Sequence, residues 1–320
     1  MSVIVVTGAN GFVGAHVVRL AAEAGHDVWA IGREPSPPRV VGAHATRYTS
    51  ADLSEGWPIA GHVDAVVHLA GLAAVGPSFS EPQRYIEINS RIMTHMGERL
   101  IAASAPTRVV VVSSGAVYAP TASGTVDESN ATAATSPYVV TKLLVEQQAH
   151  YYATRGLDVV VARPFNHIGP GQSRGFIVPD LTAAVRDAAH GEAVATGNLS
   201  AQRDYADVRD VARAHLTLAT APSHRHSTYN ISTGAPHSGR EILRTITDAL
   251  GRDDVSTTLD PARIRPNDPP RIAGDSTRLQ SEFDWRPTIS WDQSVRDYID
   301  DLHHEPGHHR LTDPRAGERS

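Results

Sequence analysis

The sequence begins with the stretch that decides the fold, Val3-Ile4-Val5-Val6-Thr7-Gly8-Ala9-Asn10-Gly11-Phe12-Val13-Gly14. Its opening run of β-branched residues is typical of a strand buried on both faces of a parallel sheet. A glycine-rich turn follows, and then an amphipathic helix that we expect to end near residue 24. Strand, glycine-rich turn and helix together are the context of a dinucleotide-binding βαβ unit.

The three glycines of this turn have separate expected roles. Gly8 would allow the tight turn, Gly11 the approach of a pyrophosphate to the helix N-terminus, and Gly14 close packing of helix on strand. The spacing is G-x-x-G-x-x-G rather than G-x-G-x-x-G, and a plain βα turn can also carry glycines. The position directly after a buried N-terminal strand favours cofactor binding. We expect this segment to contact the cofactor through Gly8, Asn10, Gly11, Phe12, Val13 and Gly14.

Composition limits the class of protein. The chain has 320 residues, 41% of them hydrophobic and 20% charged, which suits a large globular domain with a smaller partner. A net charge of -6 supplies no basic field for nucleic acid or an anionic membrane. Cysteine is absent, which excludes disulfides and thiolate chemistry. No secretory signal or membrane-spanning run is evident, so we expect a cytoplasmic protein.

Strand and helix patterns alternate over the first half of the chain. Beyond the first unit, we expect strands at 26–31, 45–48, 64–70, 108–112 and 157–162, and helices at 82–103 and 137–155. Alternation of this kind predicts an α/β fold with a Rossmann-type doubly wound parallel sheet. The later elements that we expect are a helix ending near 190, a strand and helix within 197–210, a strand at 229–232, and helices at 238–250 and 290–303.

The fading of this alternation divides the chain. We expect a cofactor-binding Rossmann domain at 1–165, with its core extended by segments near 197–235. Residues 166–304 would form mainly a smaller C-terminal α/β substrate domain, interleaved with the first. Residues 305–320 are polar and rich in histidine, and we expect a disordered tail that binds no metal.

The end of the second strand bears on the choice of cofactor. A site that prefers NAD usually places Asp or Glu there to bind the ribose 2′-hydroxyl. This strand ends in Gly32-Arg33, with Arg39 nearby and three intervening prolines that should interrupt regular structure. An arginine without an acid suits a 2′-phosphate, although a solvated loop arginine is the plain alternative. We therefore expect NADP(H) to be preferred, with NAD(H) possible.

Tyr138 and Lys142 lie four residues apart on a predicted helix that begins after Ser136-Pro137. This spacing puts both side chains on one face, one turn apart. An ammonium near a phenol favours the phenolate, so we expect Lys142 to lower the Tyr138 pKa from about 10 toward neutrality. Tyr138 could then exchange a proton with a substrate oxygen near pH 7. An isolated pair would more often be a solvated helix face, so its meaning depends on the rest of the chain.

Hydroxyl, small and polar residues follow the other predicted strands, at the carboxyl edge where open parallel sheets bind ligands. Ser113-Ser114 ends the strand at 108–112, and Arg163-Pro164-Phe165-Asn166 ends the strand at 157–162. His68 is better explained as a satisfied core histidine than as a ligand. The remaining positions expected to contact the cofactor are Arg33, Asp52, Leu53, Leu69, Ala70, Gly71, Asn89, Ser113, Tyr138, Lys142 and Pro164.

The chain resembles the extended short-chain dehydrogenase/reductase superfamily, the NAD-dependent epimerases, dehydratases and reductases of nucleotide sugars. The likeness covers roughly residues 3–300. It rests on the order and spacing of the glycine turn, Ser114, Tyr138-x-x-x-Lys142 and Arg163-Pro164-Phe165-Asn166. It is closest to the branch of nucleotide-sugar 4-ketoreductases that includes GDP-4-keto-6-deoxy-D-mannose reductase.

This resemblance implies roles for individual residues. Ser114, Tyr138 and Lys142 would form a catalytic triad, in which Tyr138 protonates the C4 carbonyl oxygen while hydride reaches C4. Ser114 would hydrogen-bond the same oxygen, and Lys142 would bind the nicotinamide ribose. The positions implied to hold the sugar nucleotide are Ser114, Asn166, Val178, Arg203 and Arg265, with Val178 at the base and the two arginines at the diphosphate.

Two departures from the superfamily pattern bear on the reaction. The 4,6-dehydratases carry an extra acid/base pair directly after the triad hydroxyl, where this chain has Gly115 and Ala116. A 4-epimerase keeps NAD tightly bound and often has an acid at the end of the second strand, which Gly32-Arg33 does not supply. The expected activity is therefore NADPH-dependent reduction of the C4 ketone of a GDP- or dTDP-linked 4-keto-6-deoxyhexose. A nucleotide-sugar 4-epimerase is the alternative, ahead of a 4,6-dehydratase or a non-catalytic NADP sensor.

The resemblance also implies a homodimer. In the superfamily, the helices that correspond to 82–103 and 137–155 pair with their copies in a four-helix bundle. Apolar residues such as Ile92, Met96 and Leu144 exceed what one core face of these helices needs.

Overall fold

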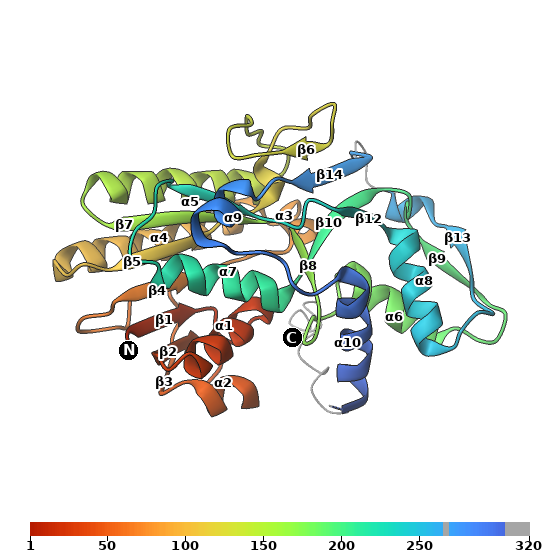
Figure 1. Ribbon diagram of the computed structural model, residues 1–320, viewed down its shortest axis with the longest axis horizontal. Coiled ribbons are helices and arrows are strands. Elements are labelled where there is room, and N and C mark those ends of the chain that lie inside the picture. The colour runs from red at the N-terminus through yellow and green to blue at the C-terminus, as the bar shows by residue number, and fades with distance from the viewer. Residues whose placement is uncertain (265–268, 305–320) are drawn as a thin grey trace.

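The main element of the structure, a computed structural model that describes residues 1–264 and 269–304, is a seven-stranded sheet. Every neighbouring pair of strands in it is parallel, which confirms the predicted doubly wound fold (Figure 1). In sheet order the strands are β11 (Thr228–Ile231), β7 (Asp158–Pro164), β5 (Arg108–Val112), β4 (Ala65–His68), β1 (Val3–Thr7), β2 (Asp27–Gly32) and β3 (Arg47–Ser50).

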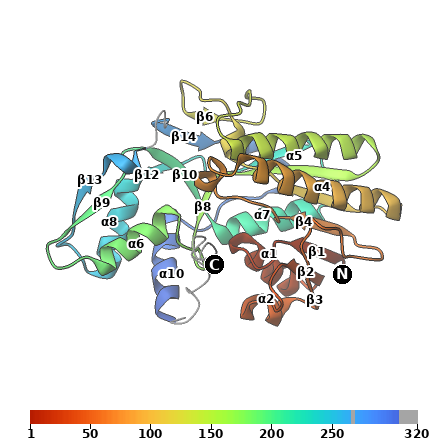
Figure 2. The same ribbon diagram turned by 180° about the vertical axis from the view of Figure 1, so that it is seen from behind.

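Helices cover both faces of this sheet, as Figure 1 and Figure 2 show from opposite sides. One face carries α1 (Phe12–Glu23) and α7 (Val208–Thr220), and the other carries α4 (Pro82–Ala103) and α5 (Pro137–Thr154). Ile4 and Val6 of β1 lie in the first core, whereas Val5 lies in the second. Burial on both faces explains the unbroken apolar run of this strand. No helix in the part of the chain that the structure describes is long and apolar enough to cross a membrane.

A second group of elements, with its own apolar core, comes from the later part of the chain except for β6, which precedes α5. Its strands are β6 (Thr125–Val126), β8 (Asn166–Ile168), β9 (Ala193–Thr196), β10 (Gln202–Asp207), β12 (Pro236–Ser238), β13 (Ser256–Leu259) and β14 (Arg271–Gly274). Its helices are α6 (Ile177–Asp187), α8 (Gly239–Leu250) and α10 (Trp291–His304). Ile168, Ile242 and Ile299 meet in this core, and β10 leads directly into α7 beside the main sheet.

The short elements escaped the sequence analysis. The helix at 82–103 and the strand at 108–112 match their predicted bounds, but β3 begins two residues later than expected. Each missed strand has only two to four residues and therefore carries few alternations, although β3, β4 and β11, of four residues each, were predicted. The missed elements are the six short strands β6, β8, β9, β12, β13 and β14, the helices α2 (Arg39–His44), α3 (Val75–Ser78) and α9 (Thr277–Phe283), and the 3₁₀ turns η1 (Gly115–Val117) and η2 (Pro261–Arg263).

The prolines between Arg33 and Arg39 interrupt regular structure as expected, because residues 33–38 belong to no helix or strand. Pro38 is the N-cap of α2, so the proline-rich loop ends by starting a helix. Proline is compatible with such a position because the first backbone N–H groups of a helix have no partner within the helix.

The helix that carries Tyr138 begins as predicted. The Ser136 side chain accepts a hydrogen bond from the Val139 backbone N–H, and Pro137 occupies the first helical position. A cap of this kind stabilises a helix by about 1 kcal/mol. The capped start of α5 therefore fixes the position of Tyr138 in the first turn of the helix.

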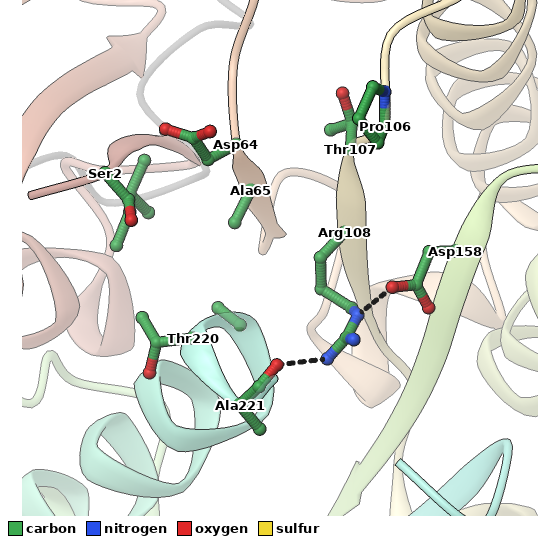
Figure 3. A pocket seen from close by; sticks show the side chains of 11 residues that line it. Ser2, Asp64, Ala65, Pro106, Thr107, Arg108, Asp158, Thr220 and Ala221 are labelled. Carbon is green, nitrogen blue, oxygen red and sulfur yellow. Dashed lines mark hydrogen bonds and ion pairs between the residues drawn. The ribbon is translucent and has the colours of Figure 1, made fainter. Parts of the chain in front are cut away.

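Arg108 closes the amino edge of the main sheet (Figure 3). Its guanidinium forms an ion pair with Asp158 at 2.5 Å and donates to the carbonyl oxygens of Leu218 and Ala221 at 3.0 and 3.3 Å, at the end of α7. A cavity of about 230 Å³ lies beside it. Because β5 runs from Arg108 to Val112, this cavity lies at the opposite edge of the sheet from Ser114.

Candidate active site

The three predicted triad residues meet at the carboxyl edge of β5. Ser114 follows this strand, and its hydroxyl accepts a hydrogen bond from the Ala116 backbone N–H at 3.1 Å. Tyr138 and Lys142 come from the first two turns of α5, which packs against β5 and η1. The Ser114 side chain is close enough to the Tyr138 hydroxyl for a hydrogen bond to act on its pKa. A proton donor, a second hydroxyl and a cation thus share one site.

The surroundings of Tyr138 raise its pKa above the ordinary value of about 10. Burial of the phenolate is the main cause, Ser114 opposes it, and Tyr85 adds to it. The prediction that Lys142 lowers this pKa is therefore wrong for the structure. The Lys142 ammonium lies 5.8 Å from the centre of the Tyr138 ring and donates to another group. Tyr138 is consequently a protonated phenol at neutral pH, the form that can donate a proton.

Lys142 is half-buried and held at the end of β5. Its Nζ donates to the backbone oxygen of Val112 at 2.9 Å. Burial lowers the pKa of Lys142 to about 8, and the nearby carboxylate of Glu146 opposes this shift. The side chain is therefore a cation at pH 7. An ammonium has three N–H donors, of which the bond to Val112 uses one.

The glycine turn has the geometry that its spacing predicts. Gly8 has φ +64°, and a Cβ atom there would lie 2.9 Å from the backbone nitrogen of Ala70. A Cβ atom at Gly14 would overlap the Gly8 carbonyl oxygen, so helix and strand pack as closely as expected. Gly11 is the N-cap of α1 and makes no side-chain capping bond. The first N–H groups of α1 therefore lack a side-chain cap, which suits an anionic ligand.

A buried hydroxyl joins the ends of β1 and β4 beside this turn. Thr7 Oγ1 accepts from the backbone N–H groups of Leu69 and Ala70, each at 3.1 Å, and contacts His68 Nδ1 at 2.8 Å. Burial lowers the pKa of His68 to about 3, so its ring is neutral. The expectation of a satisfied core histidine is confirmed, and His68 contacts Thr7 at the carboxyl end of β4.

Asn89 fixes the loop that follows β4. Its Oδ1 accepts from the Leu72 backbone N–H at 2.7 Å, and its Nδ2 donates to Leu72 O and Thr141 Oγ1 at 3.1 and 3.2 Å. A Cβ atom at Gly71, whose φ is +148°, would lie 2.8 Å from the Asn89 oxygen. Through these bonds, Asn89 holds the backbone of this loop in place and packs against Gly71.

The end of β2 carries an acid that the sequence analysis overlooked. Glu34, one residue beyond Arg33, turns back so that its carboxylate accepts from Asn10 Nδ2 at 2.5 Å. Asn10 also donates to the Tyr48 hydroxyl at 2.9 Å, and Tyr48 donates to the Glu34 backbone oxygen at 2.7 Å. Burial alone would raise the Glu34 pKa, but the Asn10 bond and the Arg33 charge lower it. This strand end therefore presents a carboxylate as well as the exposed Arg33, and the expectation that no acid is present is wrong.

The other predicted cofactor positions are mostly buried. Asp52 Oδ1 accepts from the backbone N–H and the hydroxyl of Ser54, at 2.8 and 2.7 Å, and the hydrogen bonds from Ser54 lower its pKa. The side chain of Leu53 lies in the sheet core. Pro164 is buried in β7, and the buried Ser113 Oγ has no hydrogen-bond partner within residues 1–264 and 269–304. Ser113 is thus a buried hydroxyl at the carboxyl edge of the sheet.

An aromatic contact links the glycine turn to the second group of elements. Phe12, the first residue of α1, stacks on His167 of β8 with ring centres 5.8 Å apart. Val13 beside it is half-buried. Asn166, the residue before His167, is exposed and therefore accessible to a ligand.

The predicted substrate residues differ in what they can offer a ligand. Val178 of α6 is fully buried in the second core, so its side chain has no surface to present to a nucleobase. Phe176, just before that helix, is 47% exposed. Arg203 lies on β10 and donates to the neighbouring Gln202 carbonyl oxygen at 2.7 Å. Arg265 lies outside the described residues.

Position 115 has no room for a side chain. A Cβ atom on Gly115 would lie 2.8 Å from two carbons of the buried Phe165 ring. Gly274 presses on the same ring, which also stacks on Tyr118 with centres 6.2 Å apart. Ala116 is exposed and carries only a methyl group. The two positions after Ser114 therefore hold no group that can transfer a proton.

A buried ion pair under the triad helix was not predicted. Arg163 Nε and Nη2 donate to the two carboxylate oxygens of Glu146 at 2.8 and 2.6 Å. The Arg163 guanidinium lies over the Tyr118 ring, 4.9 Å from its centre. The available sequence signal was the position of Glu146, one helical turn beyond Lys142.

Known proteins and one protein family are similar to this chain over most of its length. The profile of the NAD dependent epimerase/dehydratase family matches residues 4–232. GDP-6-deoxy-D-mannose reductase of Pseudomonas aeruginosa is 32% identical over 303 residues, or 92% of this chain and 95% of that protein. UDP-glucose 4-epimerase of Azospirillum brasilense is 29% identical over 92% of this chain and 93% of that protein. The solved structure of MoeE5 in complex with UDP-glucose and NAD has a TM-score of 0.81 and 28% identity, over 95% of this chain and 99% of that one.

Proposed function

The chain belongs to the NAD dependent epimerase/dehydratase family, and from this premise we propose that it reduces the C4 ketone of a nucleotide-activated 4-keto-6-deoxyhexose with NADPH. The nucleotide is GDP or dTDP, and the product is the 6-deoxyhexose. The observation that carries the proposal is the packing of Phe165 on Gly115, which leaves no acid/base pair beside Ser114. The likeness to a GDP-6-deoxy-D-mannose reductase supports it.

The proposed reduction needs only the groups that meet at the carboxyl edge of β5. Bound NADPH supplies the hydride. Tyr138, whose pKa is raised by burial, gives its hydroxyl proton to the C4 oxygen as this oxygen becomes an alkoxide. Ser114 donates a second hydrogen bond to the same oxygen and orients it. Lys142, whose ammonium donates to Val112 O at the end of β5, is proposed to bind the nicotinamide ribose with its remaining N–H groups.

The proposed cofactor site follows the carboxyl ends of β1, β2 and β4. The first turn of α1 has backbone N–H groups without a side-chain cap, which suits the pyrophosphate. Arg33 is exposed at the end of β2, where its guanidinium suits a 2′-phosphate. Glu34 is held against Asn10 of the glycine turn, and its carboxylate opposes a 2′-phosphate there. The NADP(H) preference rests on Arg33.

The sugar nucleotide is proposed to lie between the triad and residues 166–304, which would form the substrate domain. Asn166 is exposed and directly follows Phe165, which packs on Gly115, and Arg203 and Arg265 are proposed to bind the diphosphate. Phe176 replaces Val178 as the proposed apolar contact of the base, because Phe176 is exposed and Val178 is buried. Aromatic rings stack well on nucleobases.

A nucleotide-sugar 4-epimerase with tightly bound NAD is the second candidate. Glu34 favours it, because an acid at the end of the second strand suits a ribose 2′-hydroxyl. The likeness to a UDP-glucose 4-epimerase points the same way. Cofactor exchange separates the two reactions, since a reductase must release NADP⁺ after every turnover and an epimerase need not release NAD.

The test uses purified protein passed through gel filtration. We expect it to emerge without nicotinamide cofactor and then to oxidise NADPH only when a GDP- or dTDP-linked 4-keto-6-deoxyhexose is added. Retained NAD, with interconversion of C4 epimers and no NADPH consumption, would establish the epimerase instead.

We also propose a homodimer built on α4 and α5. Val140, Leu144 and Tyr151 of α5 are 38%, 36% and 54% exposed, which leaves an apolar face on this helix. A two-fold pairing of this face with its copy would bury it. Light scattering at micromolar concentration tests this: twice the chain mass is expected, and a monomeric mass would exclude the bundle.

A further inference from the structure

We propose that Arg163 is a positioning residue: by occupying both carboxylate oxygens of Glu146, it keeps Lys142 directed toward the active site. Lys142 and Glu146 are four residues apart on α5, a spacing at which an ammonium and a carboxylate readily pair. In the structure Lys142 instead donates to Val112 O at 2.9 Å, and Glu146 accepts from Arg163 at 2.8 and 2.6 Å. The proposal rests on the proposed function to the extent that Lys142 binds the cofactor there.

Arg163 is held in place from two sides. Its side chain and that of Glu146 are 9% and 3% exposed, so water competes little for their charges. The planar guanidinium meets both oxygens of Glu146, which an ammonium cannot do with the same geometry. On its other side lies the Tyr118 ring, at 4.9 Å, whose hydroxyl donates to Asn230 Oδ1 at 2.6 Å. Arg163 therefore contacts both the Glu146 carboxylate and an aromatic ring that is itself hydrogen-bonded.

The energetic consequence of losing Arg163 falls on Lys142. A buried carboxylate without its partner is strongly unfavourable, and it recruits the nearest cation. Lys142 is that cation, because it lies one turn away on the same helix and the Glu146 charge already acts on it. Pairing with Glu146 would draw Nζ from Val112 O toward the C-terminal end of α5, by up to about 5 Å, the rise of one turn. The ammonium would then point away from Ser114 and Tyr138.

A chain of contacts also links Arg163 to the segment that carries Ser114. Tyr118, which lies under Arg163, stacks on Phe165, and Phe165 packs on Gly115, the residue after Ser114. A role in packing alone is therefore the competing explanation of Arg163. The two explanations differ in what happens when Glu146 loses its charge as well, because an uncharged residue cannot capture Lys142.

The test measures the dissociation constant of NADPH by protein fluorescence, without any sugar substrate. Arg163→Met is expected to weaken NADPH binding at least tenfold. The double variant Arg163→Met/Glu146→Gln is expected to return to within about threefold of the parent, because neutral side chains replace the pair and Lys142 is released. Arg163→Lys keeps the positive charge but lacks the planar guanidinium. Its NADPH dissociation constant should lie between those of the parent and of Arg163→Met. Binding by the double variant that is as weak as by Arg163→Met would overturn the proposal.

A double-mutant cycle of Arg163 and Lys142 tests whether Arg163 acts through Lys142. Lys142→Met is expected to weaken NADPH binding on its own, and adding Arg163→Met to it should cost less than twofold more. A full, additive loss in the Lys142→Met background would contradict the proposal. If Arg163→Met does not fold by circular dichroism, the comparison of Arg163→Lys with Arg163→Lys/Glu146→Gln replaces it, with rescue again expected.

Arg108→Met is the matched control. It also breaks the ion pair of a buried arginine, the one with Asp158 in Figure 3, at the opposite edge of the sheet, although the Asp158 side chain is 43% exposed. It should lower the unfolding temperature and leave the NADPH dissociation constant unchanged. Since every arm measures cofactor binding alone, failure of this proposal is distinguishable from failure of 4-ketone reduction, which is measured separately with the keto sugar.

Discussion

Lys142 Nζ donates to the backbone oxygen of Val112 at 2.9 Å, which ties the second turn of the triad helix to the end of strand β5. The bond places a cation at the carboxyl edge of the sheet, within 5.8 Å of the centre of the Tyr138 ring. Because the Lys142 ammonium is partly buried, its pKa is lowered to about 8, and its charge changes at a pH at which binding can be measured. The first prediction follows from that dependence.

NADPH binding should weaken as pH rises through about 8, the value to which burial lowers the pKa of Lys142. A lowered pKa means that the ammonium is fully present below this value and is lost above it, well before a free lysine near 10.4 would deprotonate. Titration of the NADPH dissociation constant should show a one-proton decline that is absent in Lys142→Met. A decline centred near 10 would contradict the placement of Lys142 in the site.

Tyr138→Phe removes one hydroxyl and retains the ring packing. If that hydroxyl is the general acid, turnover of the keto sugar should fall by on the order of 10²- to 10⁴-fold with NADPH binding preserved. Tyr152→Phe is the matched control, because it removes a hydroxyl from the same helix at a buried position that contacts Thr94 and Glu98. Its turnover should equal that of the parent. Undiminished turnover in Tyr138→Phe would remove Tyr138 from the mechanism.

Arg33→Ala tests the cofactor preference. A charge-assisted contact with the 2′-phosphate contributes about 1.5 to 3 kcal/mol, so the loss should be roughly tenfold to a hundredfold in NADPH affinity. NADH affinity should be nearly unchanged. Glu34→Gln is the companion variant, since it removes the neighbouring negative charge and should leave NADPH affinity equal or higher. Equal losses of both cofactors in Arg33→Ala would show that Arg33 has no specific partner.

Gly115→Ala examines the packing that excludes an acid after Ser114. The added methyl must displace the Phe165 ring, and overpacking of this kind costs about 1 to 3 kcal/mol. The free energy of unfolding, from urea titration, should fall by that amount, and Phe165→Leu in the same chain should recover part of it. Ala116→Ser is the control, because position 116 is exposed and should change stability by less than about 0.5 kcal/mol. An unchanged stability in Gly115→Ala would mean that position 115 has room for a side chain.

Local patterns were enough to predict the architecture and to place Tyr138 and Lys142 on one helix. The apolar run of β1, the glycine spacing and the capped start of α5 depend only on neighbours in sequence, and each was found where expected. The pKa of Tyr138 was mispredicted because it depends on burial and on Tyr85, which comes from another helix. Spacing shows that Lys142 is near, but it does not show which acceptor Lys142 chooses.

The remaining differences have the same origin in contacts between distant segments. Glu34 lies outside the strand, and only its bond to Asn10 brings the carboxylate back to the glycine turn. The ion pair of Glu146 and Arg163 joins α5 to β7, and no periodicity in the sequence of either segment predicts it. We expected Val178 to contact the base of the sugar nucleotide, but the packing of α6 places its side chain in the core.

The most direct test of the central claim follows the hydride itself. The enzyme is incubated with a GDP- or dTDP-linked 4-keto-6-deoxyhexose and NADPH that carries deuterium at the transferable position of the nicotinamide. The account predicts one NADPH oxidised for each sugar reduced, with the deuterium at C4 of the 6-deoxyhexose product. Unconsumed NADPH and no deuterium at C4, while a nucleotide hexose changes its C4 configuration through retained NAD, would contradict it.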